Sequence, residues 1–84
     1  MRVVFSDRAV KQFKKIDFTI QKRIKHFIME LEDLENPRFR GKGLSANLSG
    51  FWRYRVGDYR LICKILDEEL VILLIDIGHR SEIY

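Results

Sequence analysis

The chain has 84 residues, 46% hydrophobic and 33% charged, and its 16 Lys and Arg outnumber its 12 Asp and Glu. This balance excludes a disordered chain and predicts one soluble domain over residues 1–84, with a net charge of +4. No apolar run approaches the roughly 20 residues of a membrane span, and no secretory leader opens the sequence, so we expect a cytoplasmic protein without membrane contact. One cysteine, Cys63, excludes an internal disulfide, and the scattered histidines predict neither a metal site nor a cofactor.

The first part of the chain predicts a strand followed by two helices. Residues 2–5 are rich in β-branched and aromatic types, which favour a short strand. Ser6 has the character of an N-cap and opens a helix over 7–15, and Asp17 caps a longer helix over 18–34. The apolar residues of the longer helix recur every three or four positions: Ile20, Ile24, Phe27, Ile28, Leu31 and Leu34. Two consecutive helices of this kind predict an antiparallel helical hairpin.

The rest of the chain predicts a loop and then a meander of strands. Asn36-Pro37 ends the second helix, and residues 36–50 are glycine-rich and basic, as in an irregular loop. Residues 51–56, 59–66 and 70–77 are strand-like and are separated by short turns. The predicted fold class is therefore α+β, in the order βααβββ, with the helical hairpin packed on a mostly antiparallel four-stranded sheet.

Alternation along the meander predicts a cluster of arginines. Trp52 and Tyr54 point to one side of their strand, whereas Arg53 and Arg55 point to the other. If the Trp52 side packs on the helices, Arg60 comes within cross-strand reach of the two arginines on the opposite face. This cluster has two interpretations: a solvated face paired with nearby carboxylates, or a surface that binds nucleic-acid phosphates. Charge pattern alone favours neither.

The segment Gly78–Tyr84 is predicted to leave the last strand with His79, Arg80 and Tyr84 close together. Histidine and tyrosine can transfer protons, and arginine can stabilise a pentavalent phosphorane. A ribonuclease that works without a metal needs these groups. The three residues are therefore candidate catalytic residues.

The stretch FWRYRVGDYRL from Phe51 to Leu61, followed by GHRSEIY from Gly78 to Tyr84, resembles the RelE/ParE toxin superfamily. The resemblance extends over essentially the whole chain, and Tyr84 favours the RelE-like branch. It implies the toxin of a type II toxin–antitoxin system, which cleaves mRNA in the ribosomal A site by attack of the 2′-hydroxyl on the scissile phosphate. It also implies three partners: a RelB-like antitoxin, the ribosome and mRNA.

The resemblance assigns roles to five residues. Arg60 would contact the scissile phosphate, and Arg80 would stabilise charge or protonate the leaving oxygen. Tyr84 would stack on the nucleotide. Arg53 and Arg55 would match a pair of basic residues that bind the RNA.

The sequence departs from the family at this pair, where RelE proteins commonly carry lysines. Arginine stays protonated, so neither Arg53 nor Arg55 can act as the general base. That role falls to Tyr84, to His79 or to a group on the ribosome. Lys42, in the basic loop, is a further candidate for phosphate binding.

Two other functions remain open at this point. A ParE-like member would poison DNA gyrase without nuclease chemistry. A catalytically inactive member would only bind an antitoxin or RNA, and the lysine-to-arginine departures keep this hypothesis open.

Overall fold

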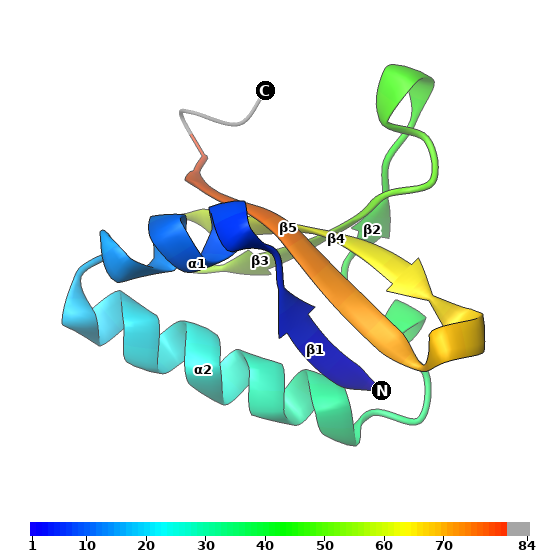
Figure 1. Ribbon diagram of the computed structural model, residues 1–84, viewed down its shortest axis with the longest axis horizontal. Helices are drawn as coiled ribbons and strands as arrows, with labels where there is room; N and C mark the ends of the chain where they lie inside the picture. Colours follow the sequence, from blue (N-terminus) through cyan, green and yellow to red (C-terminus); the bar gives the residue numbers. More distant parts are fainter. Residues whose placement is uncertain (81–84) are drawn as a thin grey trace.

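Two helices cover one face of a five-stranded sheet in the computed structural model, which describes residues 1–80 (Figure 1). The elements are β1 (Arg2–Phe5), α1 (Asp7–Lys14), α2 (Phe18–Asp33), β2 (Lys42–Gly43), β3 (Trp52–Val56), β4 (Tyr59–Leu66) and β5 (Val71–His79). The strand order is β1-β5-β4-β3-β2, with β1 parallel to β5 and the other pairs antiparallel. The predicted α+β class and the order of the helices and main strands are confirmed.

The expected count of four strands was wrong, because β2 forms inside the segment predicted as an irregular loop. Lys42 pairs with Arg53 and Gly43 pairs with Trp52, so β2 extends the sheet beyond β3. The indole N–H of Trp52 donates to the carbonyl of Arg40 at 2.8 Å and fixes the chain that leads into β2. A two-residue strand has no alternation to detect, so tertiary pairing alone creates it.

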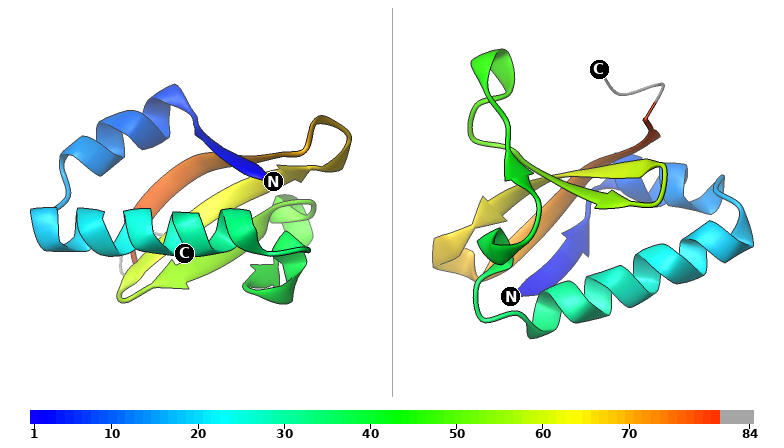
Figure 2. Two further views of the ribbon diagram at one scale, coloured as in Figure 1. Left: turned by 90° about the horizontal axis from the view of Figure 1, so that it is seen from below. Right: turned by 180° about the vertical axis from the view of Figure 1, so that it is seen from behind.

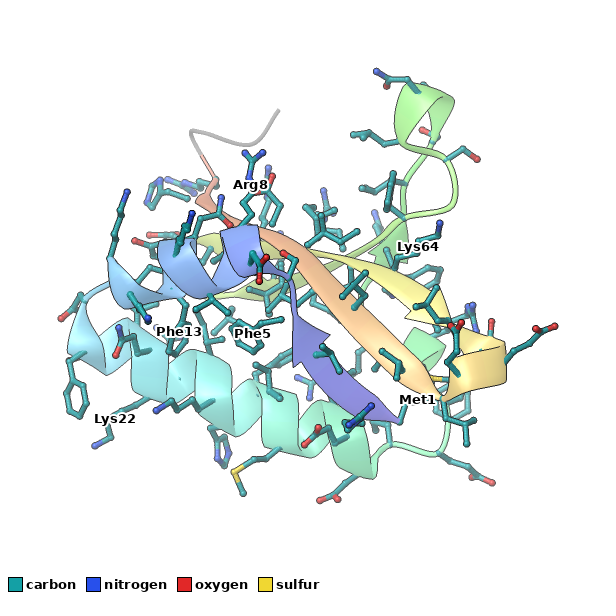
Figure 3. The ribbon with its side chains drawn as sticks, viewed as in Figure 1. Met1, Phe5, Arg8, Phe13, Lys22 and Lys64 are labelled. Carbon is teal, nitrogen blue, oxygen red and sulfur yellow. The ribbon has the colours of Figure 1, made fainter. Side chains whose placement is uncertain are left out.

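The helices begin where the sequence places their caps. The Ser6 hydroxyl accepts a hydrogen bond from the N–H of Ala9 at 3.1 Å, and the Asp17 carboxylate accepts one from Thr19 at 3.4 Å. The buried core joins the apolar faces of both helices to one face of the sheet: Ala9, Ile24, Phe27, Leu31, Tyr54, Val56, Leu61, Cys63, Ile72, Leu74 and Ile77. Figure 2 shows both helices lying across this face, and in Figure 3 Phe5 and Phe13 meet between β1 and α1.

Side chains from the helices close two stretches of sheet edge. On the outer side of β1, the N–H of Val3 donates to the carboxylate of Glu32 at 2.9 Å. Beyond the end of β1, the side chain of Gln12 from α1 bonds to the edge of β5, which no strand within the described residues covers there. Its Oε1 accepts from the N–H of Ile77 at 2.7 Å and its Nε2 donates to Asp76 at 2.6 Å. These contacts block both stretches against pairing with another strand.

A β-bulge interrupts the ladder between β4 and β5. Cys63 pairs with Leu74 but Ile62 pairs with Asp76, so Ile75 is an extra residue on β5. Before the bulge the even-numbered residues of β5 face the helices, and after it the odd-numbered residues do. The bulge therefore decides which residues at the end of β5 share a face with the arginines of β4.

A buried thiol and a buried tyrosine hydroxyl predict a loss of stability at high pH. Burial raises the pKa of the Cys63 thiol from 9.0 to about 12 and also raises the pKa of the Tyr54 hydroxyl. The folded state then holds these protons more tightly than the unfolded state, so stability is complete below pH 9 and falls as pH rises toward 12. We expect the free energy of unfolding, measured by urea titration, to fall between about pH 9 and pH 10.5, at most by about 1.4 kcal/mol per pH unit for each group that titrates.

A Cys63→Ala variant should show a shallower fall over the same pH range, whatever its stability at neutral pH. Equal slopes in the variant and the original chain would remove Cys63 as a cause.

Candidate nucleic-acid interface

Three arginines share the face of the sheet that points away from the helices. Arg55 lies directly opposite Arg60, and Arg53 lies opposite Ile62, in the register of β3 and β4. Cross-strand partners point to the same side, and Tyr54, between the two β3 arginines, is in the helix-side core. The predicted convergence of the three arginines is confirmed. We call this surface, which consists of Lys42, Arg53, Arg55 and Arg60, the arginine face.

Lys42 joins the arginine face through β2, because it is the cross-strand partner of Arg53. Ile62 on the same face is only 5% exposed although it lies outside the helix-side core. The Nε of Arg53 is buried and has no hydrogen-bond partner within residues 1–80. The planar fork of N–H donors on each arginine of this face matches the oxygens of a phosphate group.

Arg80 stands at the end of the sheet beside the turn between β3 and β4. Its backbone N–H donates to the carbonyl of Asp58 at 2.8 Å, and its guanidinium lies 4.0 Å from the Asp58 carboxylate. Asp58 precedes Arg60 by two residues, so the structure brings the two predicted catalytic arginines to the same end of the molecule. Both members of the ion pair are exposed, which leaves the Arg80 guanidinium accessible.

His79 lies on the opposite face of the sheet from Arg60, unlike the arrangement expected for a shared catalytic site. Strand β5 continues through His79, two residues beyond its predicted end, and pairs it with Tyr59. The two rings meet edge to face, with centroids 5.5 Å apart, and Tyr59 packs against the helix-side core. His79 therefore faces away from Arg60, because the bulge at Ile75 shifts the alternation by one residue.

The remaining catalytic candidate, Tyr84, lies outside residues 1–80, so its stacking role stays a prediction. In the described part of the chain, no three His, Cys, Asp or Glu side chains gather as they would to hold a metal ion. No helix there is long and apolar enough to cross a membrane.

A second group of cations, which the sequence pattern did not predict, lies beside the arginine face. A groove of about 410 Å³ between α2 and the edge of β3 is lined by Lys22 and Arg23 of α2 and by Arg40 of the loop. Arg40 lies over the ring of Phe27 at 4.7 Å and pairs with Glu30 at 3.2 Å. The concentration of cations in the first half of α2 is the sequence feature from which this group could have been predicted.

Comparison with known proteins places the chain among bacterial and archaeal toxins. Residues 3–84 match the family described as the ParE toxin of the type II toxin–antitoxin system, parDE. The mRNA interferase toxin RelE of Escherichia coli K12 is 31% identical over 83 residues, covering 95% of this chain and 85% of the relative.

Solved structures agree with this similarity. A chain of the toxin–antitoxin complex RelBE2 from Mycobacterium tuberculosis superposes with a TM-score of 0.84 and 29% identity, covering 94% of this chain and 96% of that one. The RelB–RelE antitoxin–toxin complex from Methanococcus jannaschii gives a TM-score of 0.75 and 28% identity, with 96% and 94% covered.

Proposed function

The chain belongs to the ParE toxin family, within the RelE/ParE superfamily, and from this we propose that it is a ribosome-dependent endoribonuclease of the RelE-like branch. Its substrate is mRNA in the ribosomal A site, and cleavage inhibits translation. The observation that carries the proposal is the direct opposition of Arg55 and Arg60 on a cationic face of the sheet. The similarity to a relative named as an mRNA interferase supports it along almost the whole chain.

The reaction follows from placing a phosphate between these two side chains. Two like charges directly opposite each other in a sheet repel, and an anion between them relieves the repulsion. When the 2′-hydroxyl attacks the adjacent phosphorus, the phosphorane gains negative charge, so the attraction to Arg60 and Arg55 is strongest in the transition state. The bond to the 5′-oxygen then breaks, leaving a 2′,3′-cyclic phosphate and a 5′-hydroxyl.

Proton transfer needs other groups than the β3 arginines. A base must take the proton of the 2′-hydroxyl, and an arginine cannot do so because it stays protonated. His79 lies on the helix side of the sheet, so we assign the base to Tyr84 or to a group on the ribosome. Arg80, at the same end as Arg60, stabilises the negative charge that develops on the leaving 5′-oxygen, which takes its proton from water. A base on the ribosome would by itself make cleavage depend on ribosomes.

A RelB-like antitoxin is the proposed regulator of this cytoplasmic protein. The similar structures from Mycobacterium tuberculosis and Methanococcus jannaschii are both toxin–antitoxin complexes. An antitoxin segment carrying carboxylates would neutralise the arginine face and exclude the message.

Primer extension on a reporter mRNA in a purified translation system tests the proposal. We expect cuts within A-site codons when the toxin and ribosomes are both present, and an intact message when ribosomes are omitted. Cutting of naked RNA would contradict ribosome dependence. An intact message together with continuing translation would remove the nuclease function altogether.

A ParE-like gyrase poison is the second candidate, because the matching family carries the ParE description. This function predicts inhibited supercoiling by purified gyrase and unaffected translation. The two assays together separate the candidates, since each function leaves the other assay unchanged.

A further inference from the structure

The groove between α2 and β3 continues into a second cavity along the edge of β3. The two cavities, of about 410 and 330 Å³, share Phe27, Arg40 and Arg55 in their walls. We call the joined cavities the edge groove. Its cations come from the helix, the loop and the sheet: Lys22, Arg23, Arg40, Lys42, Arg53 and Arg55.

The charge of the edge groove is almost entirely positive. Glu30 is its one carboxylate among the described lining residues, and it is already engaged by Arg40 at 3.2 Å and His26 at 3.4 Å. Within residues 1–80, the other five cations form no ion pair with a carboxylate. Their mutual repulsion is relieved by a ligand that brings several negative charges in a row.

Two of the cations are held in place by the fold. The guanidinium of Arg40 lies over the Phe27 ring at 4.7 Å in a cation–π contact. The same group also donates a hydrogen bond to the carboxylate of Glu30. Arg23 packs against the turn at Gly57, where an added Cβ would lie 3.0 Å from its Nη1. The glycine, with a φ of +59°, makes room for the guanidinium as well as for the turn. Groups fixed in this way bind a ligand with a smaller loss of side-chain entropy.

The edge groove is continuous with the arginine face. Arg55 lines both cavities and lies opposite Arg60 in the sheet, and Lys42 and Arg53 belong to both surfaces. A strand of RNA that crosses the arginine face therefore meets an unbroken path of cations over the edge of β3 and along α2.

We propose that the edge groove binds the sugar–phosphate backbone of the mRNA next to the cleaved nucleotide, an inference that rests on the proposed nuclease function. Phosphates repeat at every nucleotide and so match a row of cations that come from different elements. The free edge of β3 would also suit an extended acidic peptide. The lining has six cations but only two Phe, Tyr or Trp side chains among its described residues, Phe27 and the buried Tyr54, and this excess of charge favours a polyphosphate backbone.

The test measures binding of a fluorescein-labelled 2′-O-methyl RNA of about 12 nucleotides by fluorescence anisotropy. This RNA lacks the attacking hydroxyl, so binding is observed whether or not the protein can cut. The groove variant is Lys22→Ala with Arg23→Ala. The control variant is Lys11→Ala with Lys14→Ala, which removes the same charge from exposed positions on α1 outside the groove.

We expect the groove variant to raise the Kd about 10-fold or more, and the control variant to change it less than about 3-fold. The slope of log Kd against log salt should fall by about 1.4 in the groove variant alone, the value for two lost contacts to single-stranded RNA. Glu30→Gln removes the groove's carboxylate and should strengthen binding. Equal losses in the two double variants would overturn the proposal, because net charge alone would explain them.

Two further outcomes separate the possible failures. If the groove variant binds RNA normally but loses binding of a labelled hexaglutamate peptide, the groove is a peptide site and the proposal is wrong. If the original chain fails to cut mRNA on ribosomes while the groove variant still loses RNA affinity, the nuclease function falls and the RNA-backbone site stands. If cutting occurs and the groove variant cuts and binds like the control, the function stands and the groove inference falls.

Discussion

Replacing Arg60 with alanine is expected to lower ribosome-dependent mRNA cleavage about 10²- to 10³-fold. Arg60 is the arginine that lies opposite Arg55, where the phosphorane would form. The lost contact is stronger in the transition state than in the ground state, so the loss should be found in the single-turnover rate at saturating toxin. Quantitative primer extension on programmed ribosomes measures that rate.

Lys64→Ala is the matched control for this variant. Lys64 follows Arg60 on the same strand and the same face, but it lies opposite Leu73, away from Arg55. It should leave the cleavage rate within about 3-fold of the original. Arg60→Lys keeps the charge without the planar fork and should fall between the two. Near-normal cleavage by a folded Arg60→Ala protein would show that the reaction does not take place at the arginine face.

The second large effect concerns Gly41, and we expect Gly41→Ala to destabilise the fold by about 2–4 kcal/mol. Gly41 has a φ of +80°, which a residue with a Cβ adopts at a cost. An added Cβ would also collide with the carbonyl oxygen of Arg53, and would lie 2.7 Å from the Trp52 Nε1 and 2.8 Å from the Tyr54 Cδ1. The backbone of Arg53 and the buried ring of Tyr54 can move only at a large cost in energy, so the loop that carries Gly41 must move instead. Urea unfolding monitored by Trp52 fluorescence measures the loss.

Gly50→Ala provides the control, because it separates backbone strain from collision. Gly50 also has a positive φ, +96°, but an added Cβ there meets nothing within 4 Å. We expect a loss of about 1 kcal/mol from strain alone. If both variants lose the same stability, the close packing of Gly41 on β3 contributes nothing, contrary to our expectation.

The features that local chemistry determines could be predicted from the sequence. The caps at Ser6 and Asp17 and the apolar stripe of α2 depend on neighbouring residues, and both helices begin as expected. The side assignments on β3 and β4 followed from regular alternation, which placed Arg55 near Arg60. When one face of a strand is polar and the other apolar, the alternation in the sequence indicates which face packs on the core.

The rest of the site depends on tertiary contacts that have no local signal. Strand β5 is apolar on both faces, so nothing in its pattern marks Ile75 as the bulge that turns His79 away from Arg60. The edge groove joins Arg23, Arg40 and Arg55 from three separate segments. Only the folded arrangement of α2, the loop and β3 brings these cations together.

The pairing of β1 with β5 has a consequence for how the protein is made. Within the sheet, β1 pairs with β5 alone among the described strands, and the Ser6 hydroxyl that follows it donates to the carbonyl of Ile75, 69 residues away. While the chain is being synthesised, β1 and both helices have no completed sheet to pack on until β5 emerges. Contacts this distant in sequence form slowly and late. Chains that end before β5 lack the strand with which both β1 and β4 pair, so we expect them to stay unfolded and open to proteases.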